Sequence, residues 1–156
     1  MNVISIARLM DVHVELSRLI TYMSQLLTFD IEVTAGLRTW AEQDALYAQG
    51  RTTPGAIVTH APGGFSWHNF ALAVDLVPED ITPGQPDWNL NNPVWAKMVS
   101  VAQSVGLVSG AEWNGADKDT PHVQLTGRFP VTPNDEVRAI FQQGGITAVW
   151  TAANIQ

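Results

Sequence analysis

Two short segments of the sequence hold the residue types of a metal site. The first runs from Ser66 to Asp75 and includes His68, and the second runs from Asp119 to His122. Two histidines and one carboxylate, with a fourth position left for water, make the composition of a catalytic zinc site, whereas structural zinc sites have four protein ligands and often use cysteine. The chain contains no cysteine. The two segments therefore indicate chemistry rather than a scaffolding role.

His68 and Asp75 can bind one ion only if the chain turns between them. Seven fully extended residues would separate them by about 23 Å, yet zinc–ligand bonds are only about 2 Å long. We expect the turn over residues 69–71. In the strand expected at 72–77, side chains alternate, so Asp75 shares a face with the small Ala73, which leaves room for a ligand.

The second segment leads into another short strand, expected at 123–125. Alternation places His122 and Gln124 on one face and turns Val123 toward the core. The polar side chains of both strands can then line one side of a small sheet. Asp119, three residues before His122, supplies a second carboxylate near the same place.

The helices and strands that must position these residues are predicted from apolar periodicity and from the glycines and prolines that mark their ends. Beyond the two strands above, the pattern predicts a helix over 7–28, a strand over 31–35, a helix over 40–49, a loop over 51–66, a surface excursion over 78–93, and helices over 93–105, 135–143 and 146–153. Gly50, Gly106 and Gly144 stand where helices are expected to end. The sequence predicts one α+β domain over residues 1–156.

Composition excludes several classes of function. A formal charge of −7 with only eight scattered Lys and Arg residues argues against nucleic-acid binding, which relies on clustered cations. The sequence shows no apolar run near the roughly 20 residues that a membrane span needs, and the opening residues 1–8 show no secretory signal. We therefore expect synthesis in the cytoplasm, no nucleic-acid partner and no stable membrane association.

The two segments resemble the motifs of a known enzyme family. Ser66-x-His68-x-x-Ala71-x-Ala73-x-Asp75 is similar to the S-x-H-x-x-G-x-A-x-D signature of zinc peptidases related to D-Ala-D-Ala carboxypeptidases, and Asp119-x-Pro121-His122 is similar to their second motif. More narrowly, Gly36-Leu37-Arg38-Thr39 and Gly50-Arg51-Thr52-x-Pro54-Gly55 resemble segments of phage L-alanyl-D-glutamate endopeptidases, endolysins that cut the stem peptide of peptidoglycan. The resemblance extends from about Thr34 to Gln124.

The resemblance implies a role for each motif residue. His68, Asp75 and His122 would hold zinc, Asp119 would act as the general base, and Arg38 would stabilise an oxyanion or hold a substrate carboxylate. Further substrate contacts are expected from Ser66 and Gln43 and, outside the motifs, from His60 and Trp113, whose positions would let them border the cleft. The implied fold is the small antiparallel sheet flanked by helices of hedgehog and D-Ala-D-Ala peptidases. Because the sequence shows no wall-binding repeat or second domain, we expect a monomeric, single-domain enzyme without a separate cell-wall-binding domain. If phage-encoded, it would be made in the host cytoplasm and act on peptidoglycan at the periplasm or cell wall.

The sequence departs from the family pattern at two positions. Ala71 stands where the family has glycine, at the expected turn, and alanine is strained there if the turn needs a positive φ. Val123 replaces a common aromatic. Three alternatives stay open at this point: a D-Ala-D-Ala carboxypeptidase, a muramidase that uses Glu112 and Asp119 as its acid pair, and a non-catalytic peptidoglycan-binding relative.

Overall fold

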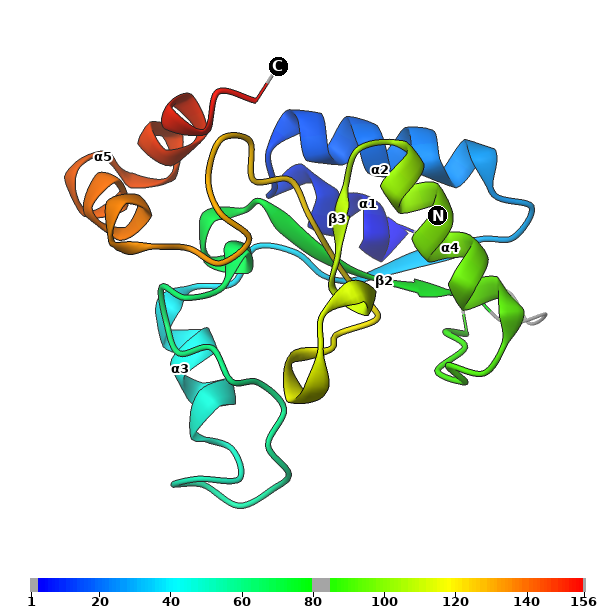
Figure 1. The fold of residues 1–156 in the computed structure, drawn as a ribbon, viewed down its shortest axis with the longest axis horizontal. Helices are drawn as coiled ribbons and strands as arrows, with labels where there is room; N and C mark the ends of the chain where they lie inside the picture. The colour runs from blue at the N-terminus through cyan, green and yellow to red at the C-terminus, as the bar shows by residue number, and fades with distance from the viewer. Residues whose placement is uncertain (1–2, 80–84, 156) are drawn as a thin grey trace.

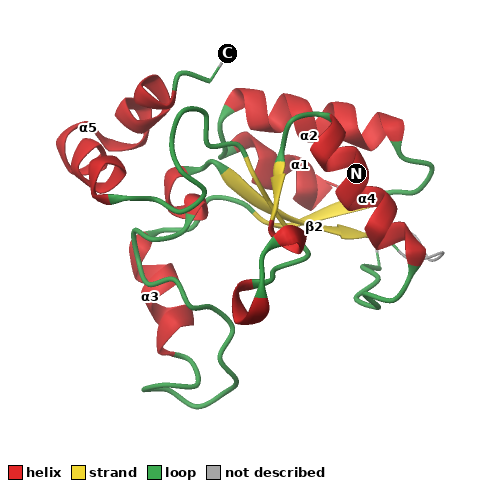
Figure 2. Cartoon of the chain, in the orientation of Figure 1, coloured by secondary structure: helices red, strands yellow, loops and turns green. Residues whose placement is uncertain are grey.

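The computed structural model, which describes residues 3–79 and 85–155, contains a four-stranded antiparallel sheet with helices packed around it (Figure 1, Figure 2). The spatial order of the strands is β1 (Ile31–Ala35), β2 (Ala73–Pro78), β4 (His122–Gln124) and β3 (Val108–Ser109). The expected α+β class and the three expected strands are confirmed, each within one residue at either end. The two-residue strand β3 was not expected, because so short a strand carries no alternation to detect.

Five α-helices and three 3₁₀ turns complete the described residues. They are α1 (Val3–Met10), α2 (Val14–Leu26), α3 (Trp40–Ala48), α4 (Pro93–Ser104), α5 (Asp135–Ala153), η1 (Trp67–Phe70), η2 (Gly110–Glu112) and η3 (Gly115–Asp117). Capping explains several of the bounds: Thr39 and Glu42 form a capping box at the start of α3, and Asn92 caps α4, which begins with proline. Gly145 has φ 68° and ψ −164° inside α5 and bends it at the expected break.

The single helix expected over residues 7–28 is wrong. The backbone breaks after Met10, and α2 starts anew behind His13, whose Nδ1 accepts a hydrogen bond from the Glu15 N–H at 3.1 Å. The apolar pattern continues across the break because Leu9, Val12 and Leu16 are all buried in the same core. Periodicity alone therefore could not reveal the break.

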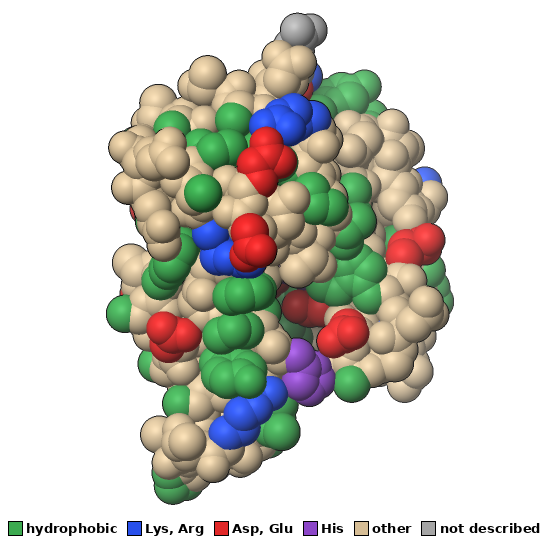
Figure 3. Space-filling view, turned by 60° about the vertical axis from the view of Figure 1, so that its left-hand side comes forward, with side chains coloured by type: hydrophobic (Ala, Val, Ile, Leu, Met, Phe, Trp, Pro, Cys, Tyr) green, Lys and Arg blue, Asp and Glu red, His purple; other side chains and the backbone are tan. Residues whose placement is uncertain are grey.

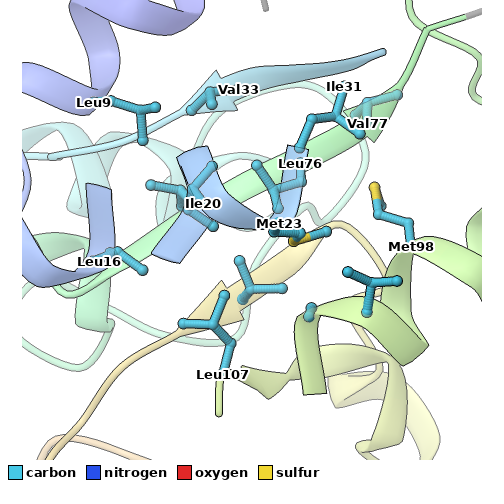
Figure 4. Packing of buried hydrophobic residues seen from close by; sticks show 14 of the residues in the cluster. Leu9, Leu16, Ile20, Met23, Ile31, Val33, Leu76, Val77, Met98 and Leu107 are labelled. Carbon is cyan, nitrogen blue, oxygen red and sulfur yellow. The ribbon is translucent and has the colours of Figure 1, made fainter. Parts of the chain in front are cut away.

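The main hydrophobic core lies between one face of the sheet and the helices α2 and α4 (Figure 1, Figure 4). Leu16, Ile20 and Met23 come from α2, Met98 comes from α4, and Leu76 comes from β2. A second cluster packs η1 and the start of β2 against α5. Asp75 lies between members of the two clusters in β2, with Ala73 in the second and Val77 in the main core.

The excursion expected over 78–93 is partly described. It returns to the sheet through a bridge between Glu79 and Pro86, and residues 80–84 of that expectation lie outside the described residues. Within the two described ranges, no helix combines the length and apolar character needed to cross a membrane.

Candidate metal centre and active site

The expected turn after His68 is present as the 3₁₀ turn η1 followed by Ala71. Ser66 and Asn69 form a capping box around η1, and the Ser66 hydroxyl accepts from the His68 N–H at 3.4 Å. Ala71 then adopts the left-handed conformation with φ 56° and ψ 33°. The sequence pattern required a turn here, and the structure shows that it needs a positive φ, at a residue that is not glycine.

Strand register brings the two segments together. Asp75 of β2 is paired with His122 of β4, and Ala73 is paired with Gln124. Directly paired residues project to the same face of an antiparallel sheet. Asp75, His122 and Gln124 therefore share the face opposite the α2–α4 core, as alternation predicted.

His68, Asp75 and His122 converge on one point. The Oδ1 atom of Asp75 lies 3.2 Å from Nε2 of His68 and 3.5 Å from Nδ1 of His122. One possible ligand atom from each residue falls within 4.8 Å of the others, which is the one such group in the parts of the chain that the structure describes. Both histidines are buried and Asp75 is partly exposed.

The outer nitrogens of both imidazole rings are bonded in a way that suits a metal. Nδ1 of His68 lies 2.8 Å from the carbonyl oxygen of Gly36, which can only accept, so this nitrogen carries the proton. Nε2 of His122 lies 2.9 Å from Oε1 of Gln124. The free lone pairs are therefore on Nε2 of His68 and Nδ1 of His122, the two atoms that face Asp75. The donor set fits a divalent metal ion with nitrogen and oxygen ligands.

The charges of the site shift three pKa values. Burial opposes ionisation of Asp75, but without a metal, when the ring nitrogens that face it carry protons, the charge of His68 and hydrogen bonds from both histidines outweigh burial and hold the pKa of this carboxyl well below its usual range. Burial disfavours the charged form of His122, yet Asp75 and Gln124 raise its pKa. Burial and the neighbouring charge of Asp75 raise the pKa of Asp119. A carboxyl that takes up protons more readily than usual is suited to act as a general base.

A cleft of about 1130 Å³ opens over these residues. Its lining includes the expected residues Arg38, His60, Ser66, Trp113 and Asp119. It also includes His68, Asp75 and His122, which are called the metal group below. Figure 3 shows a hollow surface in which acidic and histidine side chains lie beside a column of hydrophobic ones. The structure therefore brings Asp119 into the same cleft as the metal group.

Arg38 and Gln43 act as a pair. Nη2 of Arg38 lies 3.7 Å from Oδ2 of Asp75, and its Nη1 donates to Oε1 of Gln43 at 2.8 Å. Gln43 itself is fully buried and donates to the carbonyl of Ala61 at 2.8 Å. Gln43 does not line the cleft and was expected there as a substrate contact. It affects the site through its hydrogen bond with Arg38.

Two further residues border the cleft. The Trp113 ring lies 5.0 Å from the His122 ring and tilts across it. His60 lies 3.5 Å from the carboxylate of Asp117, so the loop before η1 and the turn η3 meet across the cleft. Both side chains of this contact are largely exposed.

Sequence reasoning placed Gln124 on the face of His122 without giving it a role, and it did not single out Gly110. A Cβ atom on Gly110 would lie 2.4 Å from the Asp119 carbonyl oxygen, and the Gly110 carbonyl accepts from the Asp119 N–H at 3.0 Å. Gly110 therefore lets the Asp119 segment pack close to β3 and β4. Its contact is long-range, so no local pattern could have revealed it.

Comparison with known proteins supports this arrangement. The profile of a family described as D-alanyl-D-alanine carboxypeptidase matches residues 59–125. The peptidoglycan L-alanyl-D-glutamate endopeptidase CwlK of Bacillus subtilis is 39% identical over 102 residues, which are 62% of this chain and 60% of that protein. This chain thus matches less than two thirds of the length of that relative.

Two solved structures share the fold. The L-Ala D-Glu endopeptidase ChiX of Serratia marcescens is 26% identical with a TM-score of 0.60, covering 82% of this chain and 90% of that one. The vancomycin resistance D,D-dipeptidase VanXYg, 17% identical with a TM-score of 0.53 over 90% of this chain and 59% of that one, shares the fold alone. The matched segment holds His68, Asp75 and His122, so the part of this chain that carries the candidate metal site is similar to the D-alanyl-D-alanine carboxypeptidase family.

Proposed function

We propose that this protein is a zinc-dependent endopeptidase that hydrolyses the stem peptide of peptidoglycan at the bond between L-alanine and D-glutamate. The observation that carries the proposal is the convergence of His68, Asp75 and His122 beside Asp119 at the base of one cleft. The choice of bond is supported by the relatives CwlK and ChiX, which are named for that activity.

Each residue has a defined task in this proposal. Nε2 of His68, Nδ1 of His122 and a carboxylate oxygen of Asp75 would hold zinc. When bound, zinc supplies a Lewis acid that polarises a carbonyl and lowers the pKa of water. The carboxylate of Asp119 accepts the proton of the attacking water and passes it to the departing amine. Arg38, held by Gln43, presents its guanidinium to the developing negative charge or to a substrate carboxylate.

The proposal also covers where the protein acts. Its substrate is the peptide part of the cell wall, so we propose action at the periplasm or cell wall, in the manner of a phage endolysin, by a single monomeric catalytic domain. No nucleic acid or stable membrane partner is part of this proposal.

Digestion of purified peptidoglycan followed by mass spectrometry tests the bond. We expect new L-alanine carboxyl ends and new D-glutamate amino ends, complete loss of both in chelator, and recovery on addition of zinc. Release of terminal D-alanine would instead indicate a carboxypeptidase. New reducing sugar ends that persist in chelator would indicate a muramidase. Zinc binding without any cleavage would indicate a non-catalytic peptidoglycan-binding protein.

Replacement of Asp119 tests the general base. We expect Asp119→Asn to lower kcat by about 10²- to 10⁴-fold while the zinc content stays at the wild-type level. Asp117→Asn is the matched control, because this carboxylate is in the same segment and its side chain is 74% exposed. Retained turnover in Asp119→Asn would remove the base assignment without affecting the metal requirement.

A further inference from the structure

Gln124 is a buried residue that contacts the metal group without offering a strong ligand of its own. It is 1% exposed and lies on β4, two residues after His122, so both side chains project to the same face. Its Oε1 lies 2.9 Å from Nε2 of His122, the ring nitrogen that points away from Asp75. Gln124 therefore touches the outer side of a candidate ligand.

The orientation of the Gln124 amide is set by a second contact. Its Nε2 donates to the carbonyl oxygen of Val131 at 2.8 Å, and the same oxygen accepts from the indole Nε1 of Trp67 at 2.7 Å. A carbonyl oxygen cannot donate, so the amide NH₂ must face Val131. A flipped amide would place two oxygens against each other and a donor against His122. The amide oxygen consequently faces His122.

The Val131 carbonyl also joins the two segments that carry the histidines. Trp67 is 1% exposed and immediately precedes His68 in η1, whereas Gln124 follows His122 in β4. Both side chains converge on one backbone oxygen in the segment that follows β4. A displacement of Val131 would therefore affect both segments.

We propose that Gln124, oriented by the Val131 carbonyl that Trp67 also contacts, is a positioning residue that keeps the proton of His122 on Nε2. The oxygen of the amide accepts that proton's hydrogen bond, and the lone pair of Nδ1 is left to face Asp75. The Gly36 carbonyl does the same for His68 at 2.8 Å, on the opposite ring nitrogen. This role rests on the proposed metal function of His122 and does not depend on which peptide bond is cut.

Loss of the amide has a predictable consequence. Neutral imidazole carries its proton on either nitrogen, and the hydrogen bond at one nitrogen decides which. Without the acceptor, His122 can place its proton on Nδ1, which then has no lone pair for a metal, and the ring is free to turn. Removal of such outer partners of metal-binding histidines typically costs 10- to 100-fold in metal affinity.

Zinc affinity measured by competition with a chromophoric chelator tests the proposal. We expect Gln124→Met, which keeps length and burial but removes the acceptor, to bind zinc about 10- to 100-fold more weakly than wild type. Gln124→Glu restores an acceptor toward His122 but sets a carboxylate oxygen against the Val131 carbonyl, so it should recover part of that loss. Thr126→Val is the matched control: it removes another buried polar group just after β4, one whose hydroxyl donates to the Phe129 carbonyl rather than to a residue of the metal site, and it should leave zinc affinity unchanged.

The nitrogen that carries the proton is observed directly in the zinc-loaded wild-type protein by long-range ¹H–¹⁵N correlation of the histidine rings. We expect His122 to be protonated at Nε2 and metal-bound at Nδ1. The reverse assignment, or wild-type zinc affinity in Gln124→Met, overturns the proposed role. The spectrum decides the matter even if a variant fails to fold. If the wild-type protein binds no zinc, the proposed function fails together with this role, whereas wild-type binding with an unaffected Gln124→Met overturns this role alone.

Discussion

One carboxylate oxygen of Asp75 contacts both histidines, and the other faces Arg38. Oδ1 contacts His68 and His122 at 3.2 and 3.5 Å, and Oδ2 lies 3.7 Å from the Arg38 guanidinium. Without a metal, this carboxylate is the counter-charge that keeps the rings together. The same contacts must give way in part when a metal binds, because Asp75 then shares its charge with the ion. The protonation of His122 and metal binding are therefore opposed.

This opposition predicts a pH dependence of stability. In the metal-free protein, Asp75 raises the pKa of His122 above its ordinary 6.5 although burial alone would lower it. A group with a raised folded-state pKa stabilises fully below its unfolded pKa, and that contribution is lost as pH rises through the folded value. We expect the metal-free protein to lose stability as pH rises from 6.5 through the raised pKa of His122. Zinc-loaded protein should gain stability over the same range, because protons compete less with the metal.

Thermal unfolding in chelator and in zinc, between pH 5 and pH 9, measures both trends. Ionised Asp75 also contributes to stability, but this contribution changes only at acidic pH. Because the folded protein lowers the pKa of Asp75, the contribution is complete above pH 3.8 and is lost as pH falls below that value. Asp75→Asn is the control, because it removes the main source of the His122 shift and should flatten the metal-free decline. Parallel curves with and without zinc would contradict the prediction.

The turn formed by η1 and Ala71 makes the site possible at the scale of the elements. It reverses the chain within three residues of His68, so that β2 can bring Asp75 back beneath the ring. The left-handed Ala71 is fully buried in the main core, where its methyl group packs. Strain and packing therefore act in opposite directions at this residue.

Substitution of Ala71 separates these two effects. Glycine removes a left-handed cost of about 1–2 kcal/mol but gives up a buried methyl worth about 0.8 kcal/mol, so we expect Ala71→Gly to change stability by no more than about 1 kcal/mol and to keep zinc affinity. Ala71→Val adds branching at a positive φ and should cost several kcal/mol. Ala102→Val is the control for crowding alone, since Ala102 is equally buried but lies within α4. Equal urea unfolding losses in the two valine variants would show that φ is not the cause.

Local sequence signals predicted much of the fold and the strand positions of Asp75 and His122. Alternation along β2 and β4 correctly grouped Asp75 with Ala73 and His122 with Gln124, and the strand register brings the two groups onto one face. The break between α1 and α2 could not be predicted, since its cause is tertiary: the N–H of His13 donates to the Ala71 carbonyl at 2.9 Å. The hydrogen bonds of Gln43 and Gln124 were equally hidden, because both depend on loops distant in sequence.

At the scale of the whole molecule, distant parts of the chain hold the turn after His68. The Arg38 N–H donates to the His68 carbonyl at 3.1 Å, from just before α3, and the His13 N–H reaches the Ala71 carbonyl from the start of α2. The Trp150 indole of α5 donates to the Phe70 carbonyl at 2.8 Å. The carbonyl groups that a left-handed turn leaves free are thus satisfied by segments from both ends of the chain (Figure 1). The geometry of the metal group is therefore tied to the stability of the fold.

Trp150→Phe tests this connection far from the cleft. The variant keeps an aromatic ring against His13, whose ring lies 4.9 Å away, but leaves the carbonyl of the fully buried Phe70 unpaired. An unpaired buried acceptor costs about 1–3 kcal/mol, which should lower the unfolding midpoint by several degrees. Because the same turn carries His68, we expect zinc affinity to fall too, by up to about tenfold. Trp88→Phe is the matched control, since Trp88 is 57% exposed and should change neither quantity. A destabilised Trp150→Phe protein with wild-type zinc affinity would show that α5 supports the fold without setting the position of His68.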